Sequence, residues 1–276
     1  MSDPRTTLAR PDLAAIWLEG EVRAQRYAVP EVMTVVLPSA GLHTAPSLDA
    51  EQVDQVLFGE TFMVLEVSNG FAWGQASRDG YVGFVQAAAL GPPGPAPTHQ
   101  VAALRTYAFV GPSIKTRALG PYSLNSLLAV EAAEGRFRKV AGTGWMVVEH
   151  LSPIGVHQWD VAGIAETFLG APYLWGGRGS LGVDCSGLVQ QAMLACGLAC
   201  PRDSDQQAVL GREVAPQDLV RGDLVFWKGH VAIMLDATTV LHANGYHMAT
   251  AREPLAQAVA RIGATSTGMP SAYRRV

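Results

Sequence analysis

The stretch Asp184-Cys185-Ser186-Gly187-Leu188-Val189-Gln190-Gln191-Ala192-Met193-Leu194-Ala195-Cys196 follows a glycine-rich loop at residues 175–182 and is ended by Gly197. This pattern predicts a helix that begins at or beside Cys185. A helix N-terminus stabilises an anion through its free N–H groups and its dipole, and a cysteine attacks as the thiolate. The preceding glycines let the backbone approach a substrate closely and leave the sulfur accessible. These features single out Cys185 as a candidate nucleophile, whereas Cys196 and Cys200 are interpreted as structural thiols.

Two histidines downstream flank a predicted β-hairpin. His230 opens the apolar run 231–235, His242 closes the run 239–241, and the turn falls near residues 236–238. We expect such a hairpin to bring both rings together at its open end. One imidazole is then able to take the thiol proton while the other binds its far nitrogen and fixes the tautomer. Asn244 is an alternative orienting residue, because cysteine–histidine–asparagine arrangements exist.

A metal site is the competing interpretation of the same residue types. The pairs Cys196-x3-Cys200 and His242-x4-His247 have local spacings that zinc sites use. The two pairs are, however, much farther apart than in a small zinc finger, and Cys196 is expected inside a helix. We therefore predict neither a metal nor another cofactor.

The segments around this site predict an α+β unit over residues 157–276, with helices first and an antiparallel sheet after them. Asp160 is placed to cap a helix over residues 161–169, and a further helix is expected over residues 254–262. Strands are expected at residues 224–227, 230–235 and 239–243.

Upstream of this unit lies a weak internal repeat, whose copies span residues 62–90 and 128–151. Each copy has a strand, a turn with glycine, a second strand and a short glycine–aromatic strand. The repeat predicts two small β-barrels, at residues 31–93 and 98–152, joined by the proline-rich linker 91–97. Residues 1–30 are predicted to be a short helical segment, because apolar residues recur at helical spacing over residues 11–18.

Composition limits the class of protein. The chain has 276 residues, of which 49% are hydrophobic and 16% charged, so extensive disorder is excluded. A net charge of −4 without a long basic run argues against nucleic acid as a partner. Four prolines interrupt the longest charge-free stretch, residues 81–104, so no membrane helix is expected. Only three cysteines and a charged N-terminus without an apolar segment predict a cytoplasmic protein; the oligomeric state is not predicted.

Several spaced motifs occur in a fixed order between residues 159 and 276: Pro172-Tyr173-Leu174-Trp175-Gly176-Gly177, Asp184-Cys185-Ser186-Gly187-Leu188-Val189, Pro201-Arg202-Asp203-Ser204, Gly222-Asp223-Leu224-Val225-Phe226, Gly229-His230-Val231-Ala232-Ile233 and Leu241-His242-Ala243. This order resembles the NlpC/P60 cysteine peptidases, which have a papain-like fold. The upstream repeats resemble bacterial SH3b domains. The whole arrangement is similar to the γ-D-glutamyl-L-diamino acid endopeptidases that trim murein peptides.

The resemblance implies a role for each residue of the site. Cys185 corresponds to the family nucleophile, His230 to the general base, and His242 to the residue that orients the base. Tyr173 matches a tyrosine whose hydroxyl, with the backbone N–H of Cys185, holds the oxyanion in the family. Donors aimed at the developing charge are a large source of catalysis.

The resemblance also implies a substrate. In family members of this domain arrangement, the pocket accepts the free amino group of an N-terminal L-alanine. The matching positions are Asp184, Ser186 and Ser204 in the catalytic domain, with Glu60 and Tyr81 from the first SH3b domain. The implied activity is hydrolysis of the bond between γ-D-glutamate and the diamino acid during murein peptide recycling.

Two other functions stay open. The same thiol–histidine chemistry serves an amidase or acyltransferase on another substrate. A wall-fragment-binding protein without turnover is the second alternative, although the complete set of Tyr173, Cys185, His230 and His242 argues against it.

Overall fold

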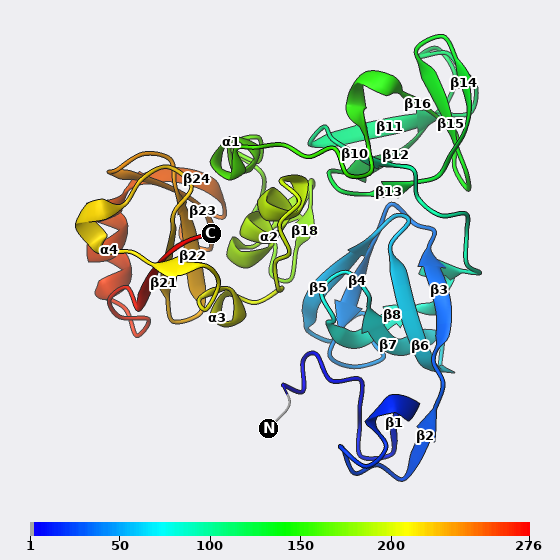
Figure 1. The fold of residues 1–276 in the computed structure, drawn as a ribbon, viewed down its shortest axis with the longest axis horizontal. Helices are drawn as coiled ribbons and strands as arrows, with labels where there is room; N and C mark the ends of the chain where they lie inside the picture. The colour runs from blue at the N-terminus through cyan, green and yellow to red at the C-terminus, as the bar shows by residue number, and fades with distance from the viewer. Residues whose placement is uncertain (1–2) are drawn as a thin grey trace. The chain divides into compact units, whose positions relative to one another are not determined.

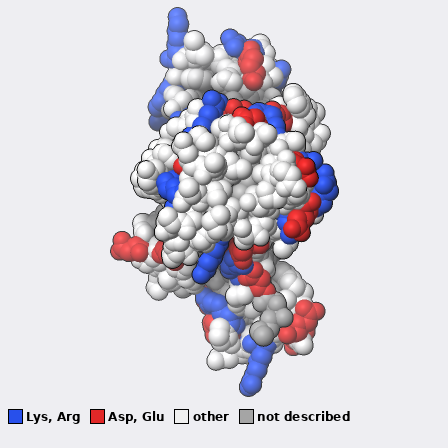
Figure 2. Space-filling model, turned by 90° about the vertical axis from the view of Figure 1, so that its left-hand side faces the viewer, with Lys and Arg blue, Asp and Glu red and all other residues white. Residues whose placement is uncertain are grey.

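The computed structural model describes residues 3–276 and divides into two compact units, Met1–Ile154 and Gly155–Val276 (Figure 1). Each unit has its own core, so each is described separately. No helix among the described residues is long and apolar enough to cross a membrane. Figure 2 shows acidic and basic side chains interspersed around a broad uncharged area, without a large field of one sign on that face.

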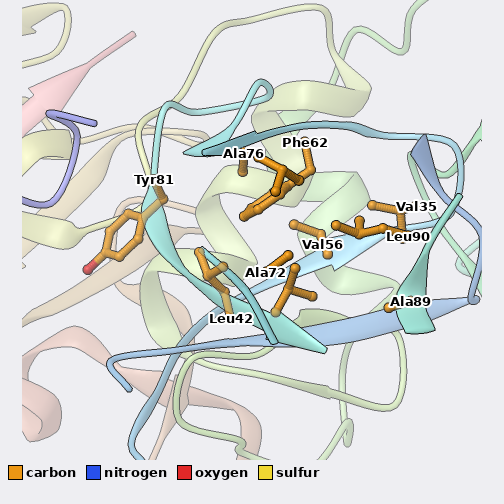
Figure 3. Packing of buried hydrophobic residues seen from close by; sticks show 11 residues of the cluster. Val35, Leu42, Val56, Phe62, Ala72, Ala76, Tyr81, Ala89 and Leu90 are labelled. Carbon is orange, nitrogen blue, oxygen red and sulfur yellow. The ribbon is translucent and has the colours of Figure 1, made fainter. Parts of the chain in front are cut away.

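The first barrel of the first unit begins at residue 31. Its sheet has the order β5-β4-β8-β7-β6-β3-β9, formed by β3 (Glu31–Val35), β4 (Ser39–His43), β5 (Gln52–Leu57), β6 (Thr61–Ser68), β7 (Phe71–Ala76), β8 (Val82–Gln86) and β9 (Leu90–Gly91). The turn between β6 and β7 is Asn69-Gly70, and both residues have positive φ, at 51° and 78°. Such a turn matches the twist of a hairpin. The inward side chains, among them Val35, Leu42 and Phe62, form the core that Figure 3 shows.

The second barrel has two sheets. The larger has the order β12-β11-β16-β15-β14 and the smaller β13-β10-β17; the strands are β10 (His99–Val101), β11 (Arg105–Phe109), β12 (Ala118–Ser123), β13 (Leu127–Leu128), β14 (Val130–Glu134), β15 (Phe137–Val140), β16 (Trp145–Val147) and β17 (Leu151–Pro153).

The predicted repeat is confirmed by these two barrels. In each copy a hairpin leads to a strand at the glycine–aromatic motif and then to a 3-10 helix, Ala87–Ala89 or Val148–His150. A short strand that begins at a leucine follows. It pairs with the first strand of its own barrel, β9 with β3 and β17 with β10. The repeated sequence pattern therefore encodes the closure of each barrel.

The two barrels pack against each other within the first unit. Phe58, which follows β5, belongs to the core of the second barrel, where its ring meets Tyr122 edge-on at 5.1 Å between ring centroids. The backbone N–H of Leu127 donates to the Phe58 carbonyl at 2.8 Å. A Cβ at Gly59 would collide with the Leu127 carbonyl oxygen, so this close approach requires glycine.

The predicted N-terminal helix over residues 11–18 is wrong. The structure has a strand β1 (Leu13–Ala15), a single 3-10 turn (Ile16–Leu18) and a strand β2 (Arg26–Ala28) that pairs with β1 in parallel. The three residues of β1 are each 0% exposed. Three consecutive buried positions do not fit a surface helix, which buries one stripe. Leu13 and Ala15 instead pack in a cluster with Trp73 of the first barrel.

The second unit is the predicted α+β domain. Its antiparallel sheet has the order β20-β25-β21-β22-β23-β24, from β20 (Arg212–Glu213), β21 (Leu224–Trp227), β22 (His230–Met234), β23 (Thr239–Asn244), β24 (Ala249–Pro254) and β25 (Ala272–Arg275). The other elements are α1 (Val161–Glu166), β18 (Arg178–Gly179), β19 (Gly182–Val183), α2 (Cys185–Ala195), α3 (Ser204–Gln207), a 3-10 turn (Pro216–Asp218) and α4 (Leu255–Gly263).

Helix α2 lies at the centre of this domain. Every residue from Cys185 to Met193 is buried, because the helix packs on α1 and on β22 and β23. Helix α4 buries Ala258 and Ile262 in a second cluster with residues of β21, β22 and β23. The expected helices at residues 185 and 254 and the three expected strands are confirmed to within one or two residues.

Candidate active site

The start of α2 holds Cys185 against the glycine-rich loop. Asp184 caps the helix, and its carboxylate accepts the N–H of Gly187 at 2.7 Å. The N–H of Asp184 donates to the Gly177 carbonyl at 3.0 Å. A Cβ at Gly187 would collide with that same carbonyl oxygen, so glycine is required there. The loop and the cap together fix the position of the thiol, which is 6% exposed.

The Asp184 carboxylate also forms a buried ion pair with Arg202. The shorter contact joins Arg202 Nη2 and Asp184 Oδ2 at 2.6 Å, and the two side chains are 1% and 8% exposed. The same carboxylate accepts the Gly176 N–H at 2.9 Å and the Ser186 hydroxyl at 3.2 Å. With a second Arg202 contact at 3.1 Å it has five donors in all. A carboxylate offers about four lone-pair sites, so this one is saturated.

This saturation bears on the predicted amine pocket. The Ser186 hydroxyl is occupied as well, since it also accepts Arg202 Nη1 at 2.8 Å. In this conformation Asp184 has no acceptor to spare for a substrate ammonium, and the Ser186 hydroxyl is engaged by both Asp184 and Arg202. Ser204 differs, because within the described residues its hydroxyl makes no hydrogen bond. Ser204 opens α3 and keeps some exposure, at 9%.

The surroundings of the thiol favour its protonated form. Burial raises the pKa of Cys185 to about 12, and the negative charge of Asp184 acts in the same direction. The backbone N–H groups of Val231 and Ser186 oppose this by lowering the pKa. The sequence led us to expect a thiolate stabilised by the helix N-terminus, but the capping carboxylate and burial outweigh that effect. The resting thiol therefore needs a base.

The two predicted histidines do meet. His230 Nε2 and His242 Nδ1 lie 2.9 Å apart, with the ring centroids 5.1 Å apart. The pairing of Ile233 with Leu241 and of Met234 with Val240 sets the register that brings them together. Because Val231 follows His230 directly and its N–H acts on the thiol, Cys185 lies at the same end of β22. The alternative orienting residue, Asn244, binds the His242 carbonyl and His247 instead.

A carboxylate that the sequence analysis missed lies behind His242. Glu253 Oε2, on β24, is 3.1 Å from His242 Nε2. Arg261 of α4 binds both Glu253 oxygens, Nη2 to Oε2 at 2.6 Å and Nε to Oε1 at 3.0 Å. The Arg261 guanidinium also lies 4.3 Å from the centre of the Tyr246 ring. Four side chains thus form one chain: His230, His242, Glu253 and Arg261.

The hydrogen-bond chain assigns the tautomers of both rings. Arg261 lowers the pKa of Glu253, so Glu253 is ionised and accepts a hydrogen bond from the His242 Nε2–H group. His242 Nδ1 then has only its lone pair and must accept from His230 Nε2. That leaves a lone pair on His230 Nδ1, to which no hydrogen bond is made within the described residues. His230 Nδ1 is therefore the basic atom of the site.

Burial keeps both rings neutral. Desolvation lowers the pKa of His230 to about 3, with the charges of His242 and Arg261 adding to the effect. Desolvation lowers the pKa of His242 to about 4, although the Glu253 carboxylate counteracts it. A neutral imidazole is the form that accepts a proton.

Tyr173 is half-buried next to the start of α2. It lies in a bridge to Val183, and its N–H donates to the Met248 carbonyl at 3.0 Å. Burial raises the pKa of its hydroxyl, and the nearby Cys185 and Asp184 raise it further. The phenol therefore stays protonated and is a hydrogen-bond donor close to the sulfur.

The structure also allows a test of the metal alternative. Among the described residues, His242, His247 and Glu253 place ligand atoms within 4.8 Å of one another. His242 nevertheless uses both ring nitrogens, for His230 and Glu253, and both Glu253 oxygens bind Arg261. A guanidinium on the carboxylate also repels a cation. The cluster fits a hydrogen-bond relay better than a metal centre.

Glu60 and Tyr81 belong to the first unit. Glu60 is 2% exposed; its Oε1 accepts Arg78 Nε at 3.0 Å, and its Oε2 accepts the Leu57 N–H at 2.9 Å. Tyr81 lies at the edge of the first barrel's core, and its hydroxyl points away from that cluster (Figure 3). Their part in substrate binding stays a prediction.

Sequence signals for the missed residues exist but are weak. Glu253 lies in the strand Ala249–Pro254 and pairs with Val240, which is buried. Paired residues of neighbouring strands lie on the same face of the sheet, so this pairing places Glu253 on a buried face. Arg202 stands in a motif that was recognised, but nothing in its spacing pairs it with Asp184. Arg261 ends an apolar helix and reads as an ordinary surface charge.

Comparison with known proteins identifies the family of the chain. The NlpC/P60 family profile matches residues 170–261, and a profile described as the bacterial dipeptidyl-peptidase Sh3 domain matches residues 42–90. A probable endopeptidase of Corynebacterium glutamicum (strain R) is 36% identical over 135 residues, covering 48% of this chain. The chain spans 57% of that relative's length.

Longer matches cover both units. The γ-D-glutamyl-L-lysine dipeptidyl-peptidase of Bacillus subtilis (strain 168) is 31% identical over 210 residues, 68% of this chain and 71% of that protein. The crystal structure of an NlpC/P60 family protein from Bacillus cereus ATCC 10987 superposes with a TM-score of 0.74 at 20% identity, covering 89% of this chain and 99% of that one. The predicted α+β fold with an SH3-like N-terminal part is confirmed. The chain belongs to the NlpC/P60 family of peptide-bond hydrolases.

Proposed function

We propose that this protein is a cysteine peptidase that cleaves murein peptides after γ-D-glutamate and releases L-Ala-D-Glu. The observation that carries the proposal is the His230–His242 contact of 2.9 Å at the end of β22 that also faces the Cys185 thiol. The similarity to the γ-D-glutamyl-L-lysine dipeptidyl-peptidase of Bacillus subtilis supports this substrate class.

The first step follows from the protonation states. The neutral His230 Nδ1 takes the proton of the Cys185 thiol as sulfur attacks the amide carbon, so the C–S bond forms while the carbonyl electrons move to oxygen. His230 becomes a cation. Its Nε2–H bond to His242, which Glu253 backs, stabilises that cation and keeps the ring oriented.

The oxyanion needs donors that are already in place. The Tyr173 hydroxyl, kept protonated by burial, and the backbone N–H of Cys185 are the two groups that we assign to it. Collapse of the intermediate breaks the C–N bond, and His230 Nδ1 gives its proton to the leaving amine. Water then attacks the thioester with His230 again as base, which releases the acid and restores the thiol.

The free N-terminal amine of the substrate is the proposed basis of selectivity. Within the catalytic unit the Ser204 hydroxyl has a free acceptor, as described above. A closed pocket that needs an ammonium would reject glycan-linked peptides, whose alanine amine is acylated.

The proposal is tested by product analysis on L-Ala-γ-D-Glu-L-Lys and on its diaminopimelate analogue. We expect L-Ala-D-Glu and the free diamino acid by mass spectrometry, and no product from the Cys185→Ala variant. Cys196→Ala is the matched control, since it removes a half-buried thiol from the same domain. Hydrolysis that persists in Cys185→Ala, or release of a different fragment, contradicts the assignment.

A role in the cytoplasmic recycling of internalised murein peptides is part of the proposal. A requirement for a free N-terminal alanine supports it, because intact wall does not offer that amine. Fractionation of the producing cells tests this part separately.

A further inference from the structure

A cavity of about 260 Å³ opens beside His230. His230 and Asn244 line one wall, and Lys228, Arg261 and Thr267 line the others. Neither Cys185 nor the residues of the predicted amine pocket line it. A second hollow in this domain, of about 460 Å³ between Trp159, Arg221 and Val276, contains no candidate catalytic residue.

The charged side chains that line the cavity beside His230 are all basic. Lys228 and Arg261 supply cationic groups, and among the described residues that line it there is no Asp or Glu. Glu253 offsets part of the Arg261 charge from behind. The Lys228 ammonium, in contrast, has no acidic partner among the described residues and is exposed at its position.

Backbone geometry fixes where Lys228 stands. Trp227 pairs with His230, so Lys228 and Gly229 form a two-residue turn between β21 and β22. Gly229 has a φ of 72°, which glycine adopts without strain. The lysine is therefore two residues from the base on a short, fixed hairpin. The Thr267 hydroxyl, which makes no hydrogen bond within the described residues, adds a donor to the same cavity.

The chemistry of the proposed reaction indicates which part of the substrate lies beside His230. His230 Nδ1 protonates the leaving nitrogen, so the leaving amino acid must lie against His230. The α-carboxylate of that amino acid is two bonds from the nitrogen. A carboxylate that enters a cavity with an unpaired ammonium gains a charge-assisted hydrogen bond.

We propose that this cavity binds the free carboxylate of the leaving amino acid, with Lys228 as its principal contact, and so selects peptides that end at the diamino acid. This inference rests on the proposed function. The carboxylate has two sources, the α-carboxylate of either diamino acid and the distal carboxylate of diaminopimelate, and substrates that differ in each group separate them.

The experiment compares four substrates: L-Ala-γ-D-Glu-L-Lys and L-Ala-γ-D-Glu-diaminopimelate, each with a free or an amidated α-carboxylate. For the wild-type enzyme we expect KM to be about tenfold lower for the free acids than for the amides, as one charge-assisted contact supplies. A preference that instead follows the distal carboxylate assigns the cavity to that group.

Variants identify the cation responsible. Lys228→Gln is expected to raise KM for the acids about tenfold and to leave the acid and amide substrates equivalent. Lys228→Arg is expected to keep the preference. Arg212→Gln, which removes an exposed charge from the edge strand β20 of the same domain, is the control.

The failures are distinguishable. Equal KM values for acid and amide in the wild-type enzyme, or an unchanged preference in Lys228→Gln, overturn the carboxylate site and leave the proposed function standing. An equal loss on acid and amide in Lys228→Gln shows that the residue supports His230 rather than a carboxylate, and also overturns it. If the wild-type enzyme cleaves none of the four substrates, the proposed function itself fails.

Discussion

Two carboxylate–guanidinium pairs support the proposed catalytic residues, one at the start of α2 and one behind the histidines. Asp184 and Arg202 lie under the nucleophile and are almost fully buried, and all the carboxylate lone pairs are used inside the domain. In the second pair Glu253 is about as buried as Asp184, at 9% exposure, but Arg261 is 24% exposed, and Glu253 also binds His242. The Asp184–Arg202 pair therefore holds the start of α2 rigid, whereas the Glu253–Arg261 pair fixes the position of the proton on His242.

Removal of the buried pair should have the largest effect, and it falls on stability. Asp184→Asn keeps the shape but leaves the buried Arg202 charge without its anionic partner, which typically costs about 3–5 kcal/mol. We expect the free energy of unfolding, measured by urea titration, to fall by this amount. Asp12→Asn, in an exposed pair with Arg10, is the control and should change little. A loss below about 1 kcal/mol would erase the distinction between the two pairs.

Glu253→Gln should act mainly on kcat. Arg261 attracts the amide oxygen of the glutamine, which turns its NH₂ toward His242 Nε2. His242 then donates through Nδ1, His230 must accept at Nε2, and the proton on His230 Nδ1 abolishes the base. We expect kcat to fall about 100-fold or more with a small change in stability.

Two variants control the Glu253→Gln experiment. Glu253→Asp keeps an acceptor and should recover part of the rate. Glu166→Gln removes a surface carboxylate that pairs with Arg221 and Arg252, and should retain full activity. If Glu253→Gln matches the wild-type kcat, the relay does not set the tautomer.

The pH profile of the activity tests whether burial keeps the histidine end of the site neutral. Burial lowers the pKa of His230 to about 3, so its neutral, basic form persists as pH falls below 6.5. We expect kcat/KM to stay near its plateau at about pH 5, well below the usual histidine range. An acid limb near pH 6.5 would show that His230 is not desolvated.

The same shifts make stability depend on pH in a stated direction. The unfolded chain binds protons on both histidines below about pH 6.5, whereas the folded chain does not. The free energy of unfolding should therefore decline as pH falls from about 6.5 toward the folded pKa values. Urea titrations across this range measure it.

The smallest effect is expected at a third pair, Glu60 and Arg78 of the first barrel. Arg78 keeps a contact with the Asn125 carbonyl at 3.2 Å, so Glu60→Gln leaves it partly satisfied and should cost about 1 kcal/mol. If Glu60 serves the amine pocket, KM for substrates with a free N-terminal amine should also rise a few-fold. Glu131→Gln, in an exposed pair with Lys139, is the control.

Sequence patterns predicted the features that depend on local chain behaviour. The helix at Cys185 follows from the glycine-rich loop before it and Gly197 after it, and the meeting of His230 and His242 follows from the length of one hairpin. The repeat in the first unit predicted both barrels because the glycine–aromatic strand and the leucine after it recur at matching places.

Features that depend on tertiary pairing were missed. Glu253 reaches His242 only through the register of β23 with β24, which the turn at residues 245–248 sets. Leu13 and Ala15 form a strand instead of a helix because Trp73, about 60 residues later, offers them a buried site. Asp184 was expected to face a substrate, and its saturation depends on Arg202, whose approach no local spacing encodes.

The Phe58 ring has a consequence for how this protein is able to change. The Phe58 side chain fills space inside the second barrel. If the two barrels were separated at the proline-rich linker, the first barrel would expose this apolar ring to water and the second would contain a cavity. Recombination between homologous enzymes therefore has to exchange the two barrels together.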